Sequence, residues 1–240
     1  MPKVLVCGDY IEDHYVFGEV SRICPEAPVP VLSKTIEYFQ AGGAGLVAKN
    51  LESLGVEVRT MYGLPSKKTR FMAGHHLLLR VDEDAKSKPV WDYHLLESLL
   101  GWNDAAVVSD YGKGTIQESN ARKILELAKV PVFVDSKKNH GLWKGAFACF
   151  PNEHEQASET QHVIRKLGSR GCEVDGVLVP TETKQVYDVT GAGDVFLAAF
   201  VWDYLEHKDL LHAAGMANKA AGISVEHLGT YVVKPDELYG

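Results

Sequence analysis

The stretch Asp188-Val189-Thr190-Gly191-Ala192-Gly193-Asp194 separates a β-like run, residues 183–187, from an apolar run, residues 195–204. Its two glycines let backbone N–H groups approach an anion closely, and a helix that starts here adds unpaired N–H groups and the positive end of its dipole. Asp194 would lie in the first turn, as a general base for a hydroxyl or a holder of a metal-bound phosphate. A glycine-rich turn whose aspartate only favours the helix dipole fits equally well, so the rest of the chain has to decide.

The composition excludes several classes of protein. The chain has 240 residues, of which 45% are hydrophobic and 24% charged, and these values predict one globular α/β domain over residues 1–240. A net charge of -7 argues against a nucleic-acid partner. No apolar run has the length of a membrane span and residues 1–3 lead straight into a strand-like run, so we expect a cytoplasmic protein without a membrane partner.

Cysteine and histidine give no sign of a metal site in the sequence. The cysteines lack the paired spacing of zinc ligands, and the histidines are scattered along the chain. We therefore expect free thiols and assign no metal to the histidines.

Apolar runs that end in polar residues alternate with helical patterns. Residues 4–7 end at Gly8-Asp9, residues 105–109 at Asp110, and residues 131–134 at Asp135. This alternation predicts a parallel sheet, and ligands bind beyond the carboxyl ends of such strands. Asp9 and Asp13 are therefore candidates for hydrogen bonds to sugar hydroxyls, although aspartates of this kind also serve as loop and capping residues.

Two segments differ from this alternation and predict a small β lid. Residues 14–39 are short strand-like runs broken by glycine and proline, and residues 66–82 are strand-like and basic. Lys68 and Arg70 in the second segment could hold a substrate phosphate, or could simply form a solvated strand face. Between the segments, residues 40–45 are glycine-rich and precede a helical pattern, which suits either close ligand approach or close packing.

Asn152 and Glu155 follow another short strand-like run at Pro151. At the start of a helix their spacing would place an amide and a carboxylate on one face, where they could order a hydrated magnesium ion beside phosphates. A proline-led helix start with acids in its first turn is the alternative interpretation.

Taken together, four segments resemble the ribokinase-like (PfkB) family of carbohydrate kinases, and the last of them is the most specific. They are Gly42-Gly43-Ala44, Asp110-Tyr111-Gly112-Lys113-Gly114, Pro151-Asn152-x-x-Glu155 and Asp188-x-Thr190-Gly191-Ala192-Gly193-Asp194. Further segments are similar to the bacterial kinases of D-glycero-β-D-manno-heptose 7-phosphate within that family. These are Gly8-Asp9, Ser21-Arg22-x-x-Pro25-Glu26-Ala27-Pro28-Val29-Pro30, Lys68-x-Arg70 and Arg80-x-Asp82.

The resemblance implies a three-layer α/β/α sandwich with a mostly parallel central sheet and a small β lid, which transfers the γ-phosphoryl group of ATP to a sugar hydroxyl with Mg2+. It implies Asp194 as the base, and an anion hole that stabilises the transferring phosphoryl group. The residues carried over are Gly191, Ala192 and Gly193 for the anion hole; Asn152 and Glu155 for the metal, through water; Lys137, Gly168, Arg170 and Asn218 for the nucleotide; and Asp9, Asp13, Gly42 and Gly43 for the sugar. Binding of the substrate's own phosphate by Lys68 and Arg70 is our inference.

The chain departs from the family pattern at Leu46, where an asparagine normally follows the Gly-Gly-Ala segment. A polar sugar contact is lost there, and Asn50, one helical turn later, could compensate only in part. The chain also has apparent deletions near residues 156–162 and 170–180, which predict looser ATP binding or help from a partner subunit.

These departures keep two alternatives open: a kinase of another sugar, such as a hexose or pentose, and a catalytically weak or idle sugar- or nucleotide-binding member of the fold. A dinucleotide-dependent oxidoreductase is set aside, because the turn after the first strand lacks the GxGxxG pattern. The strand-rich lid also predicts a homodimer in which the lids pair.

Overall fold

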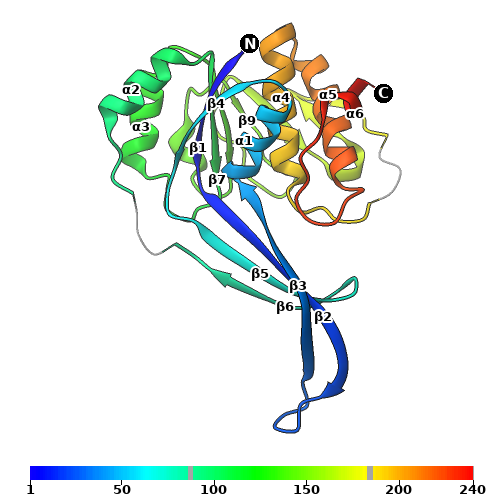
Figure 1. Ribbon diagram of the computed structural model, residues 1–240. Helices are drawn as coiled ribbons and strands as arrows, with labels where there is room; N and C mark the ends of the chain where they lie inside the picture. Colours follow the sequence, from blue (N-terminus) through cyan, green and yellow to red (C-terminus); the bar gives the residue numbers. More distant parts are fainter. Residues whose placement is uncertain (86–88, 183–185, 240) are drawn as a thin grey trace.

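The computed structural model describes residues 1–85, 89–182 and 186–239, and its centre is an eight-stranded sheet (Figure 1). The strand order across the sheet is β12-β11-β10-β9-β8-β7-β1-β4. All neighbours from β4 to β10 are parallel, whereas β11 and β12 are antiparallel. The strands are β1 (Lys3–Gly8), β4 (Glu57–Tyr62), β7 (Ala105–Asp110), β8 (Val132–Ser136), β9 (Ala148–Cys149), β10 (His162–Lys166), β11 (Cys172–Val174) and β12 (Val177–Val179).

Helices cover both faces of this sheet, as Figure 1 shows. Alternate residues of one strand face opposite sides, so Val4 and Val6 of β1 join one core cluster while Leu5 and Cys7 join another. The first cluster contains α1 (Ala44–Ser53), α4 (Ala192–His207), α5 (Leu210–Ser224) and α6 (Pro235–Tyr239); the second contains α2 (Tyr93–Trp102) and α3 (Glu118–Leu127). The three-layer α/β/α sandwich expected from the sequence is confirmed.

The lid is a second sheet of four strands in the order β3-β2-β5-β6. Its strands are β2 (Tyr10–Ile23), β3 (Pro30–Gly43), β5 (Ser66–Ala73) and β6 (His76–Glu83), which include the two segments expected to form it. Strand β2 begins two residues after β1 ends, and β3 leads directly into α1. The lid therefore extends from the carboxyl edge of the central sheet (Figure 1).

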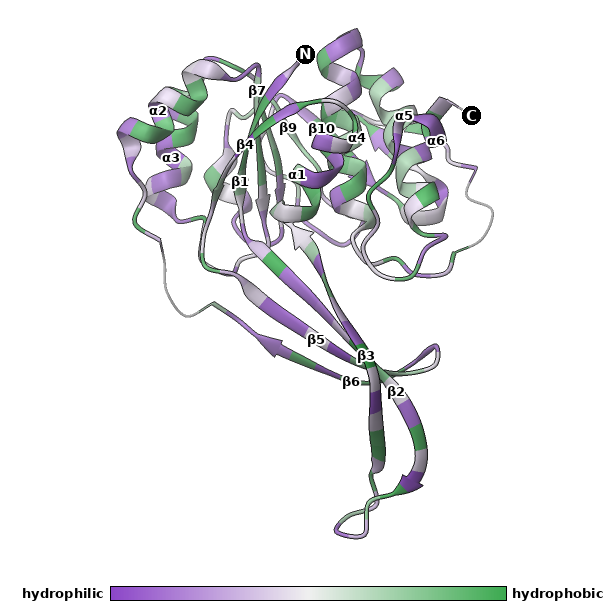
Figure 2. Ribbon diagram, in the orientation of Figure 1, coloured by the Kyte–Doolittle hydropathy of each residue, from purple (hydrophilic) through white to green (hydrophobic). Residues whose placement is uncertain are grey.

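Figure 2 shows the lid strands alternating between hydrophilic and hydrophobic residues, whereas the strands and helices of the sandwich carry broad hydrophobic stretches. In β5, Lys68 lies above the Tyr111 ring of the sandwich, while Lys67 lies above the Phe39 ring of the lid strand β3. Adjacent strand residues point to opposite faces, so the lid has one face toward the sandwich and one away from it.

One local expectation was wrong, and another falls partly outside the described residues. No helix starts at Pro151: the Asn152 side chain accepts from the His154 N–H and the Glu155 side chain accepts from the Asn152 N–H, which stabilises a turn instead. Of the β-like run 183–187, residues 183–185 lie outside the described residues, and Val186 and Tyr187 are not in a strand.

None of the described helices is long and apolar enough to cross a membrane.

Candidate active site

Helix α4 begins beside the ends of the lid, and a left-handed glycine determines where it starts. Gly191 has φ 78°, and a Cβ at this position would lie 2.4 Å from Cδ2 of Leu46 in α1. Both the backbone conformation and the space around it therefore require glycine. This tight turn allows the helix to start directly over the end of the sheet.

The start of α4 presents backbone donors. The Ala192 N–H donates weakly to the Val189 carbonyl at 3.3 Å, and the Asp194 N–H donates to the Gly191 carbonyl at 3.0 Å. The N–H groups of Gly191 and Gly193 have no acceptor within the described part of the chain. Two of the three expected anion-hole N–H groups are thus available to a ligand at the positive end of the helix dipole.

Asp194 lies in the first turn of α4 and is only 2% exposed. Its Oδ2 accepts a hydrogen bond from the Tyr111 hydroxyl at 2.9 Å, whereas its buried Oδ1 has no hydrogen-bond partner among the described residues. Burial, and then the nearby charge of Asp135, raises the pKa of Asp194 to about 7. A carboxylate with this pKa and one free oxygen is suited to accept a proton near neutral pH.

Two lysines and a buried aspartate stand next to Asp194. The Nζ of Lys137 lies 2.7 Å from Asp135 Oδ1, and the Nζ of Lys166 lies 2.5 Å from Asp135 Oδ2. Burial opposes ionisation of Asp135, yet the two ammonium groups hold its pKa below the ordinary value. Both lysines also act to lower the pKa of Asp194, against the larger effect of burial.

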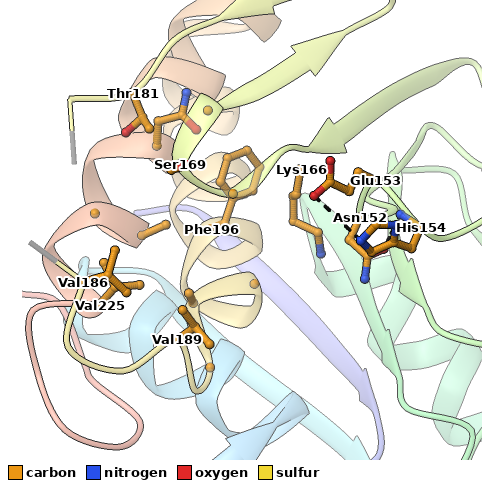
Figure 3. Close-up of a pocket in the computed structure, with 18 of the residues that line it drawn as sticks. Asn152, Glu153, His154, Lys166, Ser169, Thr181, Val186, Val189, Phe196 and Val225 are labelled. Atoms are coloured by element: carbon orange, nitrogen blue, oxygen red, sulfur yellow. Dashed lines mark hydrogen bonds and ion pairs between the residues drawn. The ribbon is translucent and has the colours of Figure 1, made fainter.

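Lys166 and Asp135 were not among the residues expected from the sequence. A Cβ on Gly193 would lie 3.4 Å from the Lys166 Nζ, so this ammonium group adjoins the start of α4. Figure 3 shows Lys166 in the cavity wall between Phe196 and Asn152. Asp135 did follow an apolar run as a polar cap, but nothing in the sequence paired it with a lysine on β10.

The start of α4 opens into a cavity of about 500 Å³ (Figure 3). One part of its wall is apolar, with Val189, Phe196 and Val225, and another part carries lysines and amides. Among the expected nucleotide residues, Lys137, Gly168 and Asn218 line the cavity. A cavity of this size with mixed walls suits a ligand that has an apolar ring and an anionic tail.

The other expected nucleotide residue, Arg170, is not part of the cavity wall. Its guanidinium group pairs with Glu153, which does line the cavity. Asn218 contributes mainly to the shape of the wall, because its side-chain amide donates to the carbonyls of Val179 and Pro180.

Asn152 and Glu155, the expected metal residues, hold each other in a turn. One Glu155 oxygen accepts from the Asn152 N–H at 2.9 Å, and the other lies 3.4 Å from the Lys137 Nζ. Asn152 lines the cavity, whereas Glu155 is not among its lining residues. Both carboxylate oxygens of Glu155 thus have partners already, so this residue fits contact with a metal through water better than direct ligation.

On the lid side, Asp13 is held between Arg70 and a glycine. Arg70 donates to Asp13 Oδ1, and a Cβ on Gly42 would lie 2.2 Å from Asp13 Oδ2. Gly43 is also required, since it has φ 56° and a Cβ there would lie 2.5 Å from the Asp9 carbonyl. The structure thus brings Asp13, Gly42, Gly43 and Arg70 together where β2, β3 and β5 leave the sandwich.

Asp9 serves the protein itself. Its carboxylate accepts hydrogen bonds from the backbone N–H groups of Tyr111, Lys113 and Thr115 at 2.8–3.1 Å, and its side chain is buried. These bonds fix the loop that carries Tyr111 next to Asp194. The structure therefore supports the alternative of a structural aspartate at least as well as contact with a sugar.

Lys68 differs from Arg70 in lacking a carboxylate partner. Among the described residues no carboxylate lies within ion-pair distance of its Nζ, which lies 5.5 Å from the centre of the Tyr111 ring. Burial lowers the pKa of the Lys68 ammonium group. A half-buried cation without a counter-ion, on the lid face toward Asp194, is a candidate for binding an anion.

Comparison with known proteins finds similarity to carbohydrate kinases. Residues 146–237 match the model of the pfkB family carbohydrate kinases. The bifunctional protein HldE of Actinobacillus succinogenes is 33% identical over 98% of this chain, and that of Nitratiruptor is 30% identical over 99%. Residues 146–237 thus form a pfkB-type carbohydrate kinase domain. The chain spans only 62–64% of the length of these two relatives.

Two solved kinase structures have the same fold. An acarbose kinase, Mak1, and the Arabidopsis thaliana ribokinase in complex with ribose and ATP both align with TM-scores of 0.74 at 18% identity. The alignments cover 99–100% of this chain and 97–98% of those chains. At this identity the likeness establishes the fold alone.

The substitution at Leu46, where the pfkB pattern has asparagine, places an apolar side chain against the start of α4. Leu46 is buried in contact with Gly191, so it packs against the turn at which α4 starts. Asn50 cannot take the place of the missing amide. Its side chain donates to the Leu46 and Tyr231 carbonyls and accepts from the Val233 N–H, which ties α1 to the C-terminal segment.

The chain is also short for this family. The alignment with the Nitratiruptor relative runs over 296 residues, although this chain has only 240. On the nucleotide side, β10, β11 and β12 follow one another through short turns and end in residues 180–182, next to the cavity. This region is where the sequence pattern predicts deletions.

Proposed function

We propose that this pfkB-family protein is an ATP-dependent kinase that phosphorylates a hydroxyl of a phosphosugar. The single observation that carries the proposal is the free, buried Oδ1 of Asp194 beside the two unpaired N–H groups at the start of α4. A base and an anion site at one helix terminus are what the transfer of a phosphoryl group to a hydroxyl requires.

In the proposed reaction, Asp194 Oδ1 accepts the proton of the attacking sugar hydroxyl. The Tyr111 hydroxyl, which donates to Oδ2, fixes the orientation of the carboxylate so that Oδ1 faces the sugar. Asp9 contributes indirectly, because it holds the loop on which Tyr111 lies. Proton acceptance is efficient because burial has brought the pKa of Asp194 near the working pH.

The charge on the transferring phosphoryl group falls among donors that the fold fixes beforehand. The N–H groups of Gly191 and Gly193 bind its equatorial oxygens, and the Lys166 ammonium group lies on the same side of Gly193. ATP bound with Mg2+ would supply the phosphoryl group, and the metal would neutralise phosphate charge. Asn152 and Glu155 are the residues placed to hold its water ligands.

The phosphate already on the substrate is assigned to Lys68, with Arg70 beside it. Arg70 is engaged by Asp13, so Lys68 is the cation that gains most from a phosphate partner. The segments similar to heptose-phosphate kinases include this pair. We therefore propose D-glycero-β-D-manno-heptose 7-phosphate as the substrate, with the 1,7-bisphosphate as product.

Leu46 supports one alternative substrate class. An apolar side chain at a position that is polar in the family pattern removes one hydrogen bond to a sugar hydroxyl, which favours another sugar that lacks this group, such as a hexose or a pentose. If the shortened nucleotide side weakens ATP binding, we expect the protein to bind sugar and nucleotide but to turn over slowly.

The proposal is tested by measuring ADP release with Mg-ATP across heptoses, hexoses and pentoses, each with and without a terminal phosphate. We expect turnover with a phosphosugar, loss of turnover in Asp194→Asn, and no ADP formation without Mg2+. Binding of sugar and nucleotide without turnover across the whole panel would refute kinase activity. Faster turnover of unphosphorylated sugars would refute the role given to Lys68.

We also propose that the lids of two copies pair in a homodimer in the cytoplasm. Strands β3 and β6 are the edges of the lid sheet, and exposed apolar side chains lie on it, including Ile36, Phe39 and Leu79. Open edges with apolar neighbours favour association with another strand. Light scattering at several protein concentrations would test the dimer.

A further inference from the structure

Three side chains meet at the junction of α4 and α5, away from the proposed active site. Asp203 belongs to α4, His207 is its last residue, and His212 lies in the first turn of α5. The chain reverses between the helices at Lys208, which has φ 57°, and Asp209 caps the start of α5. This tight reversal returns His212 onto the side chain of Asp203.

The possible ligand atoms of these three side chains lie close to one another. The Nδ1 of His207 lies 3.2 Å from Asp203 Oδ2, and the Nδ1 of His212 lies 2.7 Å from Asp203 Oδ1. Ligand atoms of all three residues lie within 4.8 Å of one another. Zinc bound tetrahedrally at about 2.0–2.2 Å from nitrogen and oxygen ligands would place them about 3.3 Å apart.

Asp203 has an oxygen that the protein leaves unsatisfied. The side chain is fully buried, and its Oδ2 has no hydrogen-bond partner among the described residues, although the His207 Nδ1 lies nearby. That nitrogen makes a hydrogen bond to the Asp203 backbone carbonyl instead. In the described chain, Asp203 forms ion pairs with the two histidines alone. A buried carboxylate in this situation gains strongly from a cation.

We propose that Asp203, His207 and His212 bind a divalent transition-metal ion, with Zn2+ as the best match. Two imidazoles and one carboxylate form a ligand set that zinc prefers and that magnesium and calcium do not. The imidazoles are partly exposed while Asp203 is buried, so an ion can enter from solvent and water can fill the fourth position.

A metal at this junction would join the end of α4 to the start of α5. Asp203 lies nine residues after Asp194 in the same helix, which corresponds to about 14 Å along its axis. The ion would therefore stabilise the helix that carries the catalytic aspartate without touching the substrates. Its effect on stability and its effect on turnover can be measured separately.

The test is a Zn2+ titration of the full chain, purified without a histidine tag, stripped with a chelator and assayed by calorimetry in nucleotide-free buffer at pH 7.5. We expect one equivalent of tightly bound Zn2+ and a higher melting temperature. His207→Ala and His212→Ala should each weaken binding about tenfold or more. His94→Ala, which removes an exposed histidine of α2, is the matched control and should bind like the wild type.

Replacing the metal by Co2+ provides a second measurement that does not depend on the stability of the variants. A tetrahedral site of nitrogen and oxygen ligands should give visible d–d absorption in the wild type and in His94→Ala, and the absorption should be lost in His212→Ala. Zn2+ binding that both histidine variants retain, or binding no tighter in the wild type than in His212→Ala, would overturn the proposal. Neither result depends on kinase activity.

Discussion

Replacing Asp194 by Asn should strongly lower turnover and at the same time change how stability depends on pH. Burial raises the pKa of this carboxyl from 3.8 to about 7. At a pH between these two values, the unfolded chain has therefore lost a proton that the folded protein retains. Wild-type stability therefore falls as pH rises from about 4 to about 7 and stays lower above. At ~1.4 kcal/mol per pKa unit, ionised Asp194 costs the folded state about 4 kcal/mol above pH 7.

The asparagine variant has no buried charge at this position, so its folded state is not destabilised in this way above pH 7. Its Oδ1 can still accept from the Tyr111 hydroxyl, but its Nδ2 becomes a buried donor without a partner, which costs about 1–3 kcal/mol at every pH. The change with pH is therefore more informative than the absolute difference. Linkage predicts that the stability of Asp194→Asn relative to the wild type increases by about 2–3 kcal/mol between pH 5 and pH 8.

Urea denaturation of both proteins at pH 5, 6, 7 and 8 measures this quantity. Glu97→Gln, at an exposed carboxylate of α2, is the control and should show no such trend. Loss of the general base should lower turnover by about 10²–10⁴-fold. A stability difference that is constant with pH, or that favours the wild type more strongly at pH 8, would refute the raised pKa of Asp194.

Three further predictions concern the surroundings of Asp194. Lys68→Met should raise KM about tenfold or more for a phosphosugar and leave KM for the unphosphorylated sugar nearly unchanged. Lys67→Met, on the opposite lid face, is the control, and equal changes of KM in the two variants would contradict phosphate binding by Lys68. Lys166→Met removes a charge that lowers the pKa of Asp194, so kcat should fall about 10²-fold. The midpoint of the pH profile of kcat/KM, near pH 7 in the wild type, should move to higher pH, and an unmoved midpoint would exclude this coupling. Gly191→Ala places a Cβ against Leu46 at a residue with φ 78°, so it should lower stability by about 1–3 kcal/mol and abolish turnover. Urea denaturation and ADP release measure the two effects, and a variant that is both stable and active would contradict the tight turn.

Sequence patterns located the start of α4 correctly because the signal is contiguous. A left-handed turn, a helix start and a first-turn carboxylate all depend on residues 188–194, so local sterics and hydrogen bonding are enough to define them. The lid was located for a similar reason, since proline and glycine interrupt helical periodicity wherever the chain leaves the main sheet. The helix expected at Pro151 failed because side-chain hydrogen bonds of Asn152 and Glu155 competed with helix formation.

The partners of Asp194 could not be predicted in the same way. Asp135 lies on β8 and Lys166 lies on β10, with β9 between these two strands. Their side chains meet because the register of the strands brings both to one edge of the sheet. Likewise, a single sequence gives no indication that Asp9 would be bound by the loop after β7, or that Asn50 would hold the C-terminal segment. Each of these contacts joins residues that are far apart along the chain.

The sequence by itself therefore determined the fold class, the position of the proposed base and the glycines beside it, because these depend on short-range conformation and periodicity. Only the tertiary structure decided which charges surround Asp194, that Lys68 has no carboxylate partner among the described residues, and which histidines meet Asp203. The physical reason is that electrostatic energies depend on burial and on distances of a few ångströms, and both are set by how separate segments pack.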